Sequence, residues 1–176
     1  MDFSDLIEAR RSVRKYQPAA ISASELEAIV TDALEAPSWK NTEVTRYHAA
    51  IDEAAKARAF AALPSFNVAS SQNAAALVAV AFKRGESGYF GDAPANELGE
   101  GWGVYDSGIA TGYFVLAAKN RGWDTLILGL RDEAATRRAF GIPADETLVS
   151  VIALGRAAAE SRKPPRRSAA ETMHVC

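Results

Sequence analysis

The sequence has very few of the residues that cross-link a chain or bind zinc. Its one cysteine, Cys176, is the last residue printed, so no disulfide can form within the chain. Its place at a chain end also argues against a role as a catalytic nucleophile. The two histidines, His48 and His174, lie far apart in sequence, which argues strongly against a zinc site of cysteine and histidine. We therefore expect no metal centre.

Long apolar runs are missing too. No stretch approaches the roughly 18 uncharged apolar residues that a membrane-spanning helix needs. The first residues, Met1–Asp5, are acidic and have neither the basic nor the apolar region of a signal peptide, so we expect a cytoplasmic protein. The composition, 48% hydrophobic and 24% charged, excludes general disorder. Residues 1–176 are long enough for one domain with a substantial core and short for two.

The usual nucleotide-binding and hydrolase motifs are absent. Gly101 and Gly103 begin a GxGxxG pattern, but its sixth position is Asp106. The chain has neither a glycine-rich loop ending in Gly-Lys-Ser/Thr nor a Gly-x-Ser-x-Gly elbow. It also offers no convincing triad or carboxylate pair. We therefore predict no catalytic side chain from these patterns.

The net charge is small, but the charges are unevenly distributed. The formal net charge of -2 comes from 20 basic and 22 acidic residues. Eight of the basic residues lie in two groups, within residues 10–15 and 162–167. Without these eight, 12 basic residues remain against 22 acidic residues, so the rest of the protein is acidic. An acidic body repels a polyanion, so nucleic acid is not an expected partner. Most charge runs are simply solvated surface, and that interpretation applies here as well.

Hydrophobic spacing predicts a chain of alternating helices and strands. The run Ala74–Phe82 is continuously apolar, which is typical of a strand buried on both faces, although a buried helix would show the same pattern. Beyond Ala157 the chain is a basic, proline-containing tail. We expect helices over Phe3–Val13, from the Ser22 capping box to Pro37, over Glu53–Leu63, Asp106–Arg121 and Asp132–Phe140, and strands over Tyr47–Ile51, Ala74–Phe82, Thr125–Leu128 and Thr147–Leu154.

Two neighbouring segments depart from an ordinary small domain. Gly85–Gly103 is too long for a simple connection and contains Tyr89, Phe90 and Trp102, which suggests a lid over a site or a mobile insertion. The helix over Asp106–Arg121 is apolar on nearly every side. Such a helix has to be buried all round, and a subunit interface would provide that burial.

The N-terminal arginines are candidates for binding an anion. In a helix that continues to Val13, Arg10 shares a face with Leu6 and Ile7 and would point inward or into a cleft. A buried guanidinium needs an anionic partner, and its planar fork suits a phosphate or a carboxylate. The pattern leaves two possibilities open, an anion-binding site and a structural salt bridge.

Five segments, in this order along nearly the whole chain, resemble the FMN-dependent nitroreductase family. The first two are Arg10-Arg11-Ser12-Val13-Arg14-Lys15-Tyr16 and Ala36-Pro37-Ser38-Trp39-Lys40-Asn41. The third is Asn67, ahead of the predicted central strand. The fourth is Leu126–Asp132 followed by Phe140-Gly141-Ile142-Pro143, and the fifth is Pro164-Pro165-Arg166-Arg167 with Glu171-Thr172-Met173-His174.

The resemblance implies an α+β fold of three layers, in which helices flank a central, mostly antiparallel sheet. It also implies an intertwined homodimer with two FMN sites at the interface, each lined by both subunits. The helix over Asp106–Arg121 would form the dimer core, and the extension 157–176 would pack on the partner subunit.

The resemblance also implies which residues bind FMN. The resemblance places Arg10, Arg11, Ser12 and Arg14 beside the phosphate, the ribityl chain and the pyrimidine edge of FMN. Arg166 and Arg167 would complete the phosphate site. From the partner subunit the resemblance brings Pro37, Ser38 and Asn41. Asn67 would hydrogen-bond the flavin or the ribityl chain, and the backbone of Gly129 and Leu130 would approach the reactive part of the ring.

Each of these residues also has a plain structural interpretation. Ser12 would cap or end the first helix, and Pro37 with Ser38 would stop the second. Gly129 would mark a bend where two elements pack closely, and Asn41 and Asn67 would be turn residues. The sequence alone leaves both interpretations open.

The activity implied is electron transfer from NADH or NADPH through FMN to an electron-poor small molecule, by a ping-pong mechanism. Because the flavin carries the chemistry, no catalytic side chain is required. The chain departs from many family members in having Glu43-Val44-Thr45 where they have Gln-Pro-Trp, and Gly129 where they have Glu. These departures bear on the acceptor rather than on the cofactor.

Two other classes of protein remain. One is a protein that senses, stores or fragments FMN without turning over NAD(P)H. The other is a dimer without flavin whose basic groups bind a different phosphorylated ligand.

Overall fold

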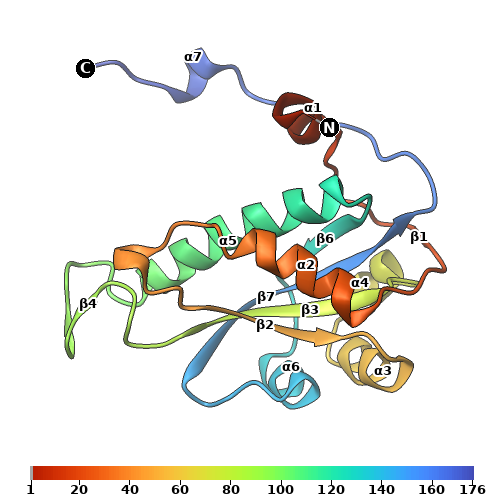
Figure 1. Cartoon of the computed structure of the whole chain (residues 1–176), viewed down its shortest axis with the longest axis horizontal. Coiled ribbons are helices and arrows are strands. Elements are labelled where there is room, and N and C mark those ends of the chain that lie inside the picture. Colours follow the sequence, from red (N-terminus) through yellow and green to blue (C-terminus); the bar gives the residue numbers. More distant parts are fainter. Residues whose placement is uncertain (1) are drawn as a thin grey trace.

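A five-stranded sheet forms the centre of the structure, which a computed structural model describes for residues 2–176 (Figure 1). Strand β7 pairs with β1, β3 and β6, and β3 pairs with β2, all antiparallel. In the described residues the one parallel pairing is an isolated bridge between Ser12 and Thr125. The strands are β1 (Tyr16–Gln17), β2 (Thr45–Ala50), β3 (Ala76–Lys83), β6 (Asp124–Leu128) and β7 (Glu146–Ala157).

Helices cover both faces of this sheet (Figure 1). On one face lie α2 (Ala23–Ala33) and α5 (Gly101–Asn120), which contribute Ile29 and Phe114 to one core cluster. The other face carries α3 (Glu53–Ala61), α4 (Ser65–Ser71) and α6 (Glu133–Phe140). The predicted α+β class with three layers and a mostly antiparallel sheet is confirmed.

Strand β3 is the middle of the core. Its residues alternate between the two clusters, with Leu77 and Ala79 on one face of the sheet and Val78 and Val80 on the other. All of β3 except Lys83 is buried. A strand covered on both faces has no polar side to show, which explains why its sequence is apolar throughout. Of the two structures predicted for Ala74–Phe82, a buried strand and a buried helix, the strand is therefore the one that forms.

Helix α2 begins as predicted. The Ser22 side chain accepts a hydrogen bond from the Glu25 N–H, and the Glu25 side chain bonds back to the Ser22 N–H, so the capping box is complete. The helix ends at Ala33, before it reaches Pro37. Pro37 lies four residues, about one turn, beyond the last residue of α2. The prediction that the helix continues to Pro37 is therefore wrong.

Helix α1 (Phe3–Ala9) is shorter than the predicted Phe3–Val13. The chain turns extended at Arg10, and the Val13 N–H donates to the Thr125 carbonyl of β6 at 3.0 Å. This bond to a distant strand replaces the helical bond that Val13 would otherwise make. None of the residues of α1 is buried.

The segment before α5 is a small hairpin. It consists of β4 (Tyr89–Phe90) and β5 (Ala93–Pro94), and α5 starts at Gly101, five residues before the predicted Asp106. A Cβ atom at Gly103 would lie 2.3 Å from the Phe82 ring, so this glycine lets α5 pack directly on β3.

The two ends of the chain meet at the β1–β7 pairing. Tyr16 is paired with Ala157, and the Ala158 N–H donates to the Lys15 carbonyl at 2.9 Å. The tail then continues past a Lys163–Glu8 ion pair of 2.6 Å to a short helix, α7 (Ala169–Thr172). Figure 1 shows α1 and this tail standing away from the sheet and its helices.

None of the helices in residues 2–176 combines the length and the apolar character needed to cross a bilayer.

Candidate anion-binding site

Arginines from both ends of the chain line one cleft of about 470 Å³. The first group follows α1, and the second lies in the tail that follows β7. The pairing of β1 with β7 brings the two groups together. The residues that line the cleft are Arg10, Arg11, Ser12, Arg14, Arg162, Pro164, Pro165 and Arg166.

The cleft carries positive charge without a compensating acid. Among residues 2–176 none of its five arginines forms an ion pair, and the nearby Glu8 pairs with Lys163 instead. Their hydrogen bonds go to carbonyl groups: Arg14 donates to the Ser12 carbonyl at 3.3 Å, and Arg166 to the Pro164 carbonyl at 3.2 Å. The structural salt bridge considered for these arginines is therefore not formed.

The electrostatic cost of this arrangement appears at Arg10. Partial burial, followed by the like charges of Arg166 and Arg11, lowers the pKa of the Arg10 guanidinium from its ordinary value. Each of these causes disfavours the charged form. A bound anion would act in the opposite direction, because it would offset the repulsion between the arginines. The cleft is thus arranged to receive a multiply charged anion such as a phosphate.

The route by which Arg10 reaches the cleft differs from the prediction. Because α1 ends at Ala9, Arg10 does not continue a helix face with Leu6 and Ile7. Ile7 is itself half exposed, so that face is not an inward one. Arg10 lines the cleft because the chain turns extended at this point, which helical spacing could not indicate.

The tail arginines that line the cleft are not the pair that the resemblance implies. Arg166 lines the cleft, whereas Arg167 is exposed and does not. Arg162, which lies in the same basic group but was not assigned to the site, lines it. The extended tail has no periodicity that could reveal which of its side chains face the cleft.

Ser12 lies at the cleft and does not cap α1. Its backbone forms the parallel bridge with Thr125, which attaches the Arg10–Arg14 segment to β6. The helix-cap interpretation of Ser12 is therefore wrong. Ser12 lines the cleft together with its five arginines, and a serine hydroxyl can donate to an anion.

Pro37, Ser38 and Asn41 lie elsewhere in the same chain. Pro37 and Ser38 line a small hollow with Asp106, near the start of α5. Asn41 closes the short 3₁₀ helix η1 (Trp39–Asn41) and has a left-handed backbone with φ of 57°. It therefore does occupy a turn, as the structural interpretation proposed. None of the three lines the arginine cleft.

Asn67 and Leu130, in contrast, are brought together. The Asn67 amide donates to the Leu130 carbonyl at 2.7 Å from a position inside α4, so Asn67 is not a turn residue. A Cβ atom added at the preceding Gly129 would meet no atom within 4 Å. Gly129 is therefore not a point of close packing within the chain, and the space in front of it is open to a ligand.

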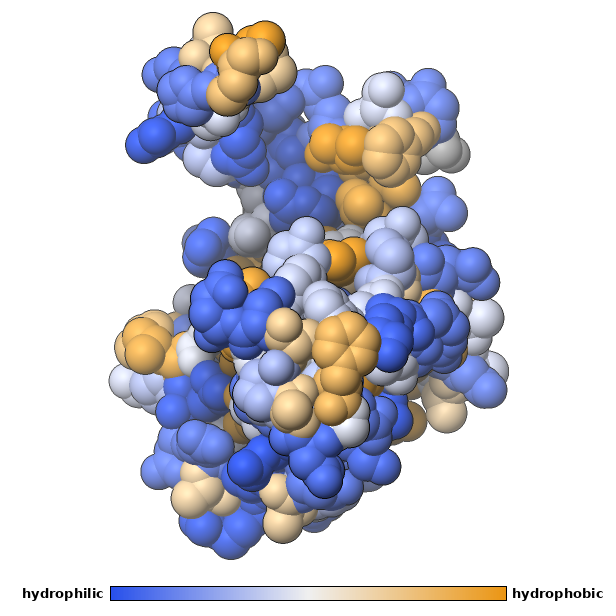
Figure 2. Space-filling view, turned by 90° about the vertical axis from the view of Figure 1, so that its left-hand side faces the viewer, coloured by the Kyte–Doolittle hydropathy of each residue, from blue (hydrophilic) through white to orange (hydrophobic). Residues whose placement is uncertain are grey.

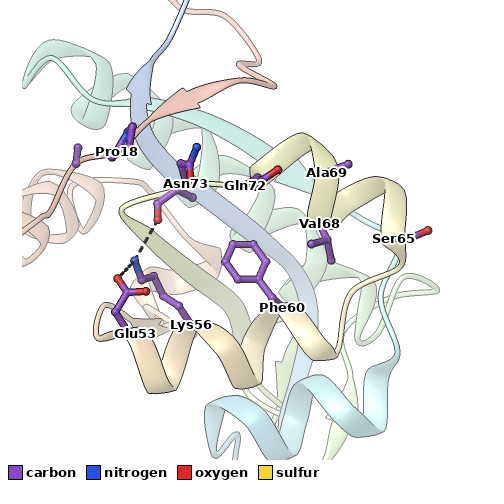
Figure 3. Close-up of a pocket in the computed structure, with 11 residues that line it drawn as sticks. Pro18, Glu53, Lys56, Phe60, Ser65, Val68, Ala69, Gln72 and Asn73 are labelled. Carbon is purple, nitrogen blue, oxygen red and sulfur yellow. Dashed lines mark hydrogen bonds and ion pairs between the residues drawn. The ribbon is translucent and has the colours of Figure 1, made fainter.

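A separate cavity lies on the face of the sheet that carries α3 and α4. It measures about 630 Å³ and is bounded by the end of β1, α3, α4 and the turn at Asn73 (Figure 3). Lys56 lies against it, with its ammonium group 2.7 Å from Glu53, which offsets the charge. None of the predicted site residues lines this cavity.

Comparison with known proteins now identifies the family. The sequence profile of the Nitroreductase family matches residues 7–156, which include α1 from Ile7 onward and the whole sheet except Ala157, the last residue of β7. The chain belongs to the nitroreductase family. The resemblance drawn from its five sequence segments is thereby confirmed.

Relatives of this nitroreductase-family chain cover almost its full length. YdgI of Bacillus subtilis (strain 168), a proposed NAD(P)H nitroreductase, is 25% identical over 90% of each chain. A proposed nitroreductase from Exiguobacterium sibiricum 255-15, solved in complex with FMN, has a TM-score of 0.90 at 22% identity and covers 100% of this chain and 98% of its own. The enone reductase CLA-ER of gut-bacterial fatty acid saturation has a TM-score of 0.86 at 22% identity, with 99% and 97% covered.

We expect inorganic phosphate to stabilise this nitroreductase-family protein through the cleft. Replacing Arg166 by Gln should remove much of the rise in melting temperature that phosphate causes, where each 1 kcal/mol of binding corresponds to about 2–4 °C in a domain of this size. Without phosphate the same variant should be at least as stable as the wild type, because a like charge is gone. Thermal unfolding with and without phosphate measures both effects.

The matched control is Arg167→Gln, which removes the same charge one residue further on, outside the cleft. It should keep the full response to phosphate. An equal loss in both variants would show that the response depends on overall charge and not on this cleft.

Proposed function

We propose that the protein is an FMN-dependent oxidoreductase. It takes electrons from NADH or NADPH and passes them to an electron-poor small molecule such as a nitro compound, a quinone, an enone or a flavin. The observation that carries the proposal is the arginine cleft, whose uncompensated charge suits a phosphate dianion. The FMN bound by the Exiguobacterium protein and the NAD(P)H in the name of YdgI support the same cofactor and donor.

The described residues fit FMN at two places. The guanidinium groups of the cleft donate only to carbonyls of the chain and retain further N–H groups for phosphate oxygens. The open space in front of Gly129 leaves backbone accessible to a flat ring. Arg10, Arg14, Arg162 and Arg166 would hold the phosphate, while the Gly129–Leu130 backbone and Asn67 would lie beside the ring system.

When bound, FMN supplies the redox step between donor and acceptor. The chain's own residues anchor and orient it. The arginines hold the phosphate end, and the Asn67–Leu130 hydrogen bond keeps the backbone after β6 in one position. The donor leaves before the acceptor binds, so one site serves both in a ping-pong cycle.

The functional unit is a homodimer. Helix α1 has no buried residue, and its Phe3 and Ile7 are 69% and 50% exposed. Helix α5 exposes Tyr105 and Tyr113, and its Gly108 faces open space. A seven-residue helix without packing is not stable in water, which favours a second copy that covers these surfaces.

A second copy would also complete the site. The hollow of Pro37 and Ser38 contains Asp106, whereas the arginines lie near the far end of α5, where Lys119 and Arg11 line a common hollow. The thirteen residue-to-residue steps from Asp106 to Lys119 span about 20 Å of helix. We infer that Pro37, Ser38 and Asn41 of one subunit serve the flavin held by the arginines of the other.

The tail 157–176 packs on the partner in this proposal. Residues 162–176 are all exposed in the single chain, and Met173 and Val175 are apolar. A groove between α2 and β2 offers a place for such a segment, with about 580 Å³ of space lined by Leu26, Val30 and Tyr47, among others. Among residues 2–176 strand β2 pairs with β3 alone, so its other edge could accept an added strand.

The proposed activity is tested by the colour of the protein. Purified protein reconstituted with FMN should be yellow, and NADH or NADPH added without oxygen should bleach its visible flavin absorbance. An electron-poor acceptor should then restore the colour. Stopped-flow absorbance with each donor, followed by each acceptor, measures both half-reactions.

Two outcomes would contradict the oxidoreductase. A yellow protein that neither donor bleaches is a flavin-binding protein without NAD(P)H turnover. A protein that fails to take up FMN at all contradicts both of these functions and favours another phosphorylated ligand at the cleft.

We expect a single charge on the open face of α5 to break the dimer. A Cβ atom at Gly108 would meet no described atom within 4 Å, so Gly108→Glu should leave the fold of one subunit intact while placing a charge in the interface. Light scattering after size exclusion should give twice the 18.8 kDa chain mass for the wild type and a single chain for the variant.

The control is Ala134→Glu, which adds the same charge at an exposed position of α6. It should remain a dimer. Dimeric Gly108→Glu protein, or monomeric wild type, would contradict an interface on this face of α5.

A further inference from the structure

One carboxylate holds together the two segments at the start of α5. Asp106 is 2% exposed and accepts hydrogen bonds from the Trp39 N–H at 3.1 and 3.2 Å and from the Ser87 hydroxyl at 2.6 Å. Within residues 2–176 it pairs with no cation. A buried carboxylate is costly unless donors satisfy it, so these donors and Asp106 are held to each other.

The segment that Asp106 holds is strained. The chain has four non-glycine residues with positive φ in its described part, and three of them lie within the four residues after Trp39: Lys40 at 47°, Asn41 at 57° and Glu43 at 50°. Side chains disfavour this left-handed region, so the turn keeps its shape only if its surroundings impose it. Strain of this kind is typical of segments that present groups to a ligand.

Hydrogen bonds within the turn use some, but not all, of the donors and acceptors of the Ser38 and Asn41 side chains. The Ser38 hydroxyl oxygen accepts from the Glu43 N–H at 2.9 Å, which leaves its hydrogen free to donate. The Asn41 amide nitrogen donates to the Glu43 carboxylate at 2.8 Å, which leaves its carbonyl oxygen free to accept. The turn therefore keeps both hydrogen-bond donors and a carbonyl acceptor that its own bonds do not use.

Aromatic rings attach the same turn to the hairpin. The Trp39 ring lies 4.6 Å from that of Trp102 and 6.2 Å from that of Phe90, and the Lys40 ammonium lies 4.7 Å from the Phe90 ring centre. Ser87 ties the start of the hairpin to the same carboxylate. Figure 2, which views the molecule from the end that carries β4, shows a hydrophobic patch surrounded by hydrophilic residues. Phe90 of the hairpin and Tyr105 of α5 are both exposed.

We propose that Asp106 is a positioning residue for the flavin site, which acts through the Trp39 N–H to fix the turn that carries Ser38 and Asn41. The proposal rests on the proposed function, in which that turn serves the FMN of the neighbouring subunit. In this proposal Asp106 acts on the turn and not by contact with the cofactor. Its hydrogen bond with Ser87 also fixes the position of the hairpin relative to the turn.

Asp106→Ala removes the acceptor. The variant should bind FMN about ten- to a hundredfold more weakly, the range expected for losing hydrogen bonds to a charged group. Asp106→Asn keeps a carbonyl oxygen for the Trp39 N–H and should restore most of the affinity. Ser107→Ala is the matched control, because Ser107 is equally buried on α5 but bonds to the Gly103 carbonyl and not to the turn. FMN titration of the dimer by flavin fluorescence measures all three.

A double-mutant cycle separates positioning from general stability. If Asp106 acts through the turn, Asn41→Ala should weaken FMN binding in the wild type but add little to Asp106→Ala. Additive losses would show that the two residues act independently and would overturn the proposal. If Asp106→Ala does not fold, Asp106→Ser replaces it, since the shorter hydroxyl cannot reach the Trp39 N–H.

A second readout needs no flavin. The close Trp39–Trp102 pair should give a strong near-ultraviolet circular dichroism signal, which Asp106→Ala should diminish and Ser107→Ala should keep. A folded Asp106→Ala dimer with unchanged signal and unchanged FMN affinity would overturn the proposal. If the wild type binds no FMN, the proposed function fails, and the tryptophan signal still decides whether Asp106 fixes the turn.

Discussion

The pairing of β1 with β7 is the constraint on which the anion site depends. Tyr16 can lie against β7 because residue 155 is glycine: a Cβ atom there would come within 2.6 Å of the Tyr16 ring. Because β1 pairs with β7, the N-terminal arginines just before β1 and the tail arginines just after β7 lie close together and line one cleft. More than a hundred residues separate the two groups along the chain. The small net charge of the chain conceals this gathering, because the acids lie elsewhere.

A second constraint acts at the other end of α5. There Asp106 fixes a strained turn, while the arginines lie near the end of the helix that contains Lys119. One rigid helix thus separates the two halves of the proposed flavin site within a chain. A homodimer would join the halves of different subunits, which makes association a condition for cofactor binding and not merely a means of covering apolar surface.

The sequence was informative where local rules decide the structure. The Ser22 capping box and the buried strand near Ala74–Phe82 are present, because capping and apolar burial are readable from neighbouring residues. The end of α1 was not readable, since Thr125 supplies the competing bond from far along the chain. Arg162 was missed because an extended tail has no period. Asp106 could have been noticed as a carboxylate in an otherwise apolar helix, but its partners Trp39 and Ser87 are visible only in the fold.

If the arginine cleft recognises the phosphate of a flavin nucleotide, the affinity for the flavin should depend on that phosphate. The most direct measurement is a comparison of FMN with riboflavin, which has the same ring and ribityl chain but no phosphate. In fluorescence titrations at one salt concentration, FMN should bind at least about a hundredfold more tightly, since several charge-assisted hydrogen bonds are lost with the phosphate. Equal affinities for FMN and riboflavin would contradict the account.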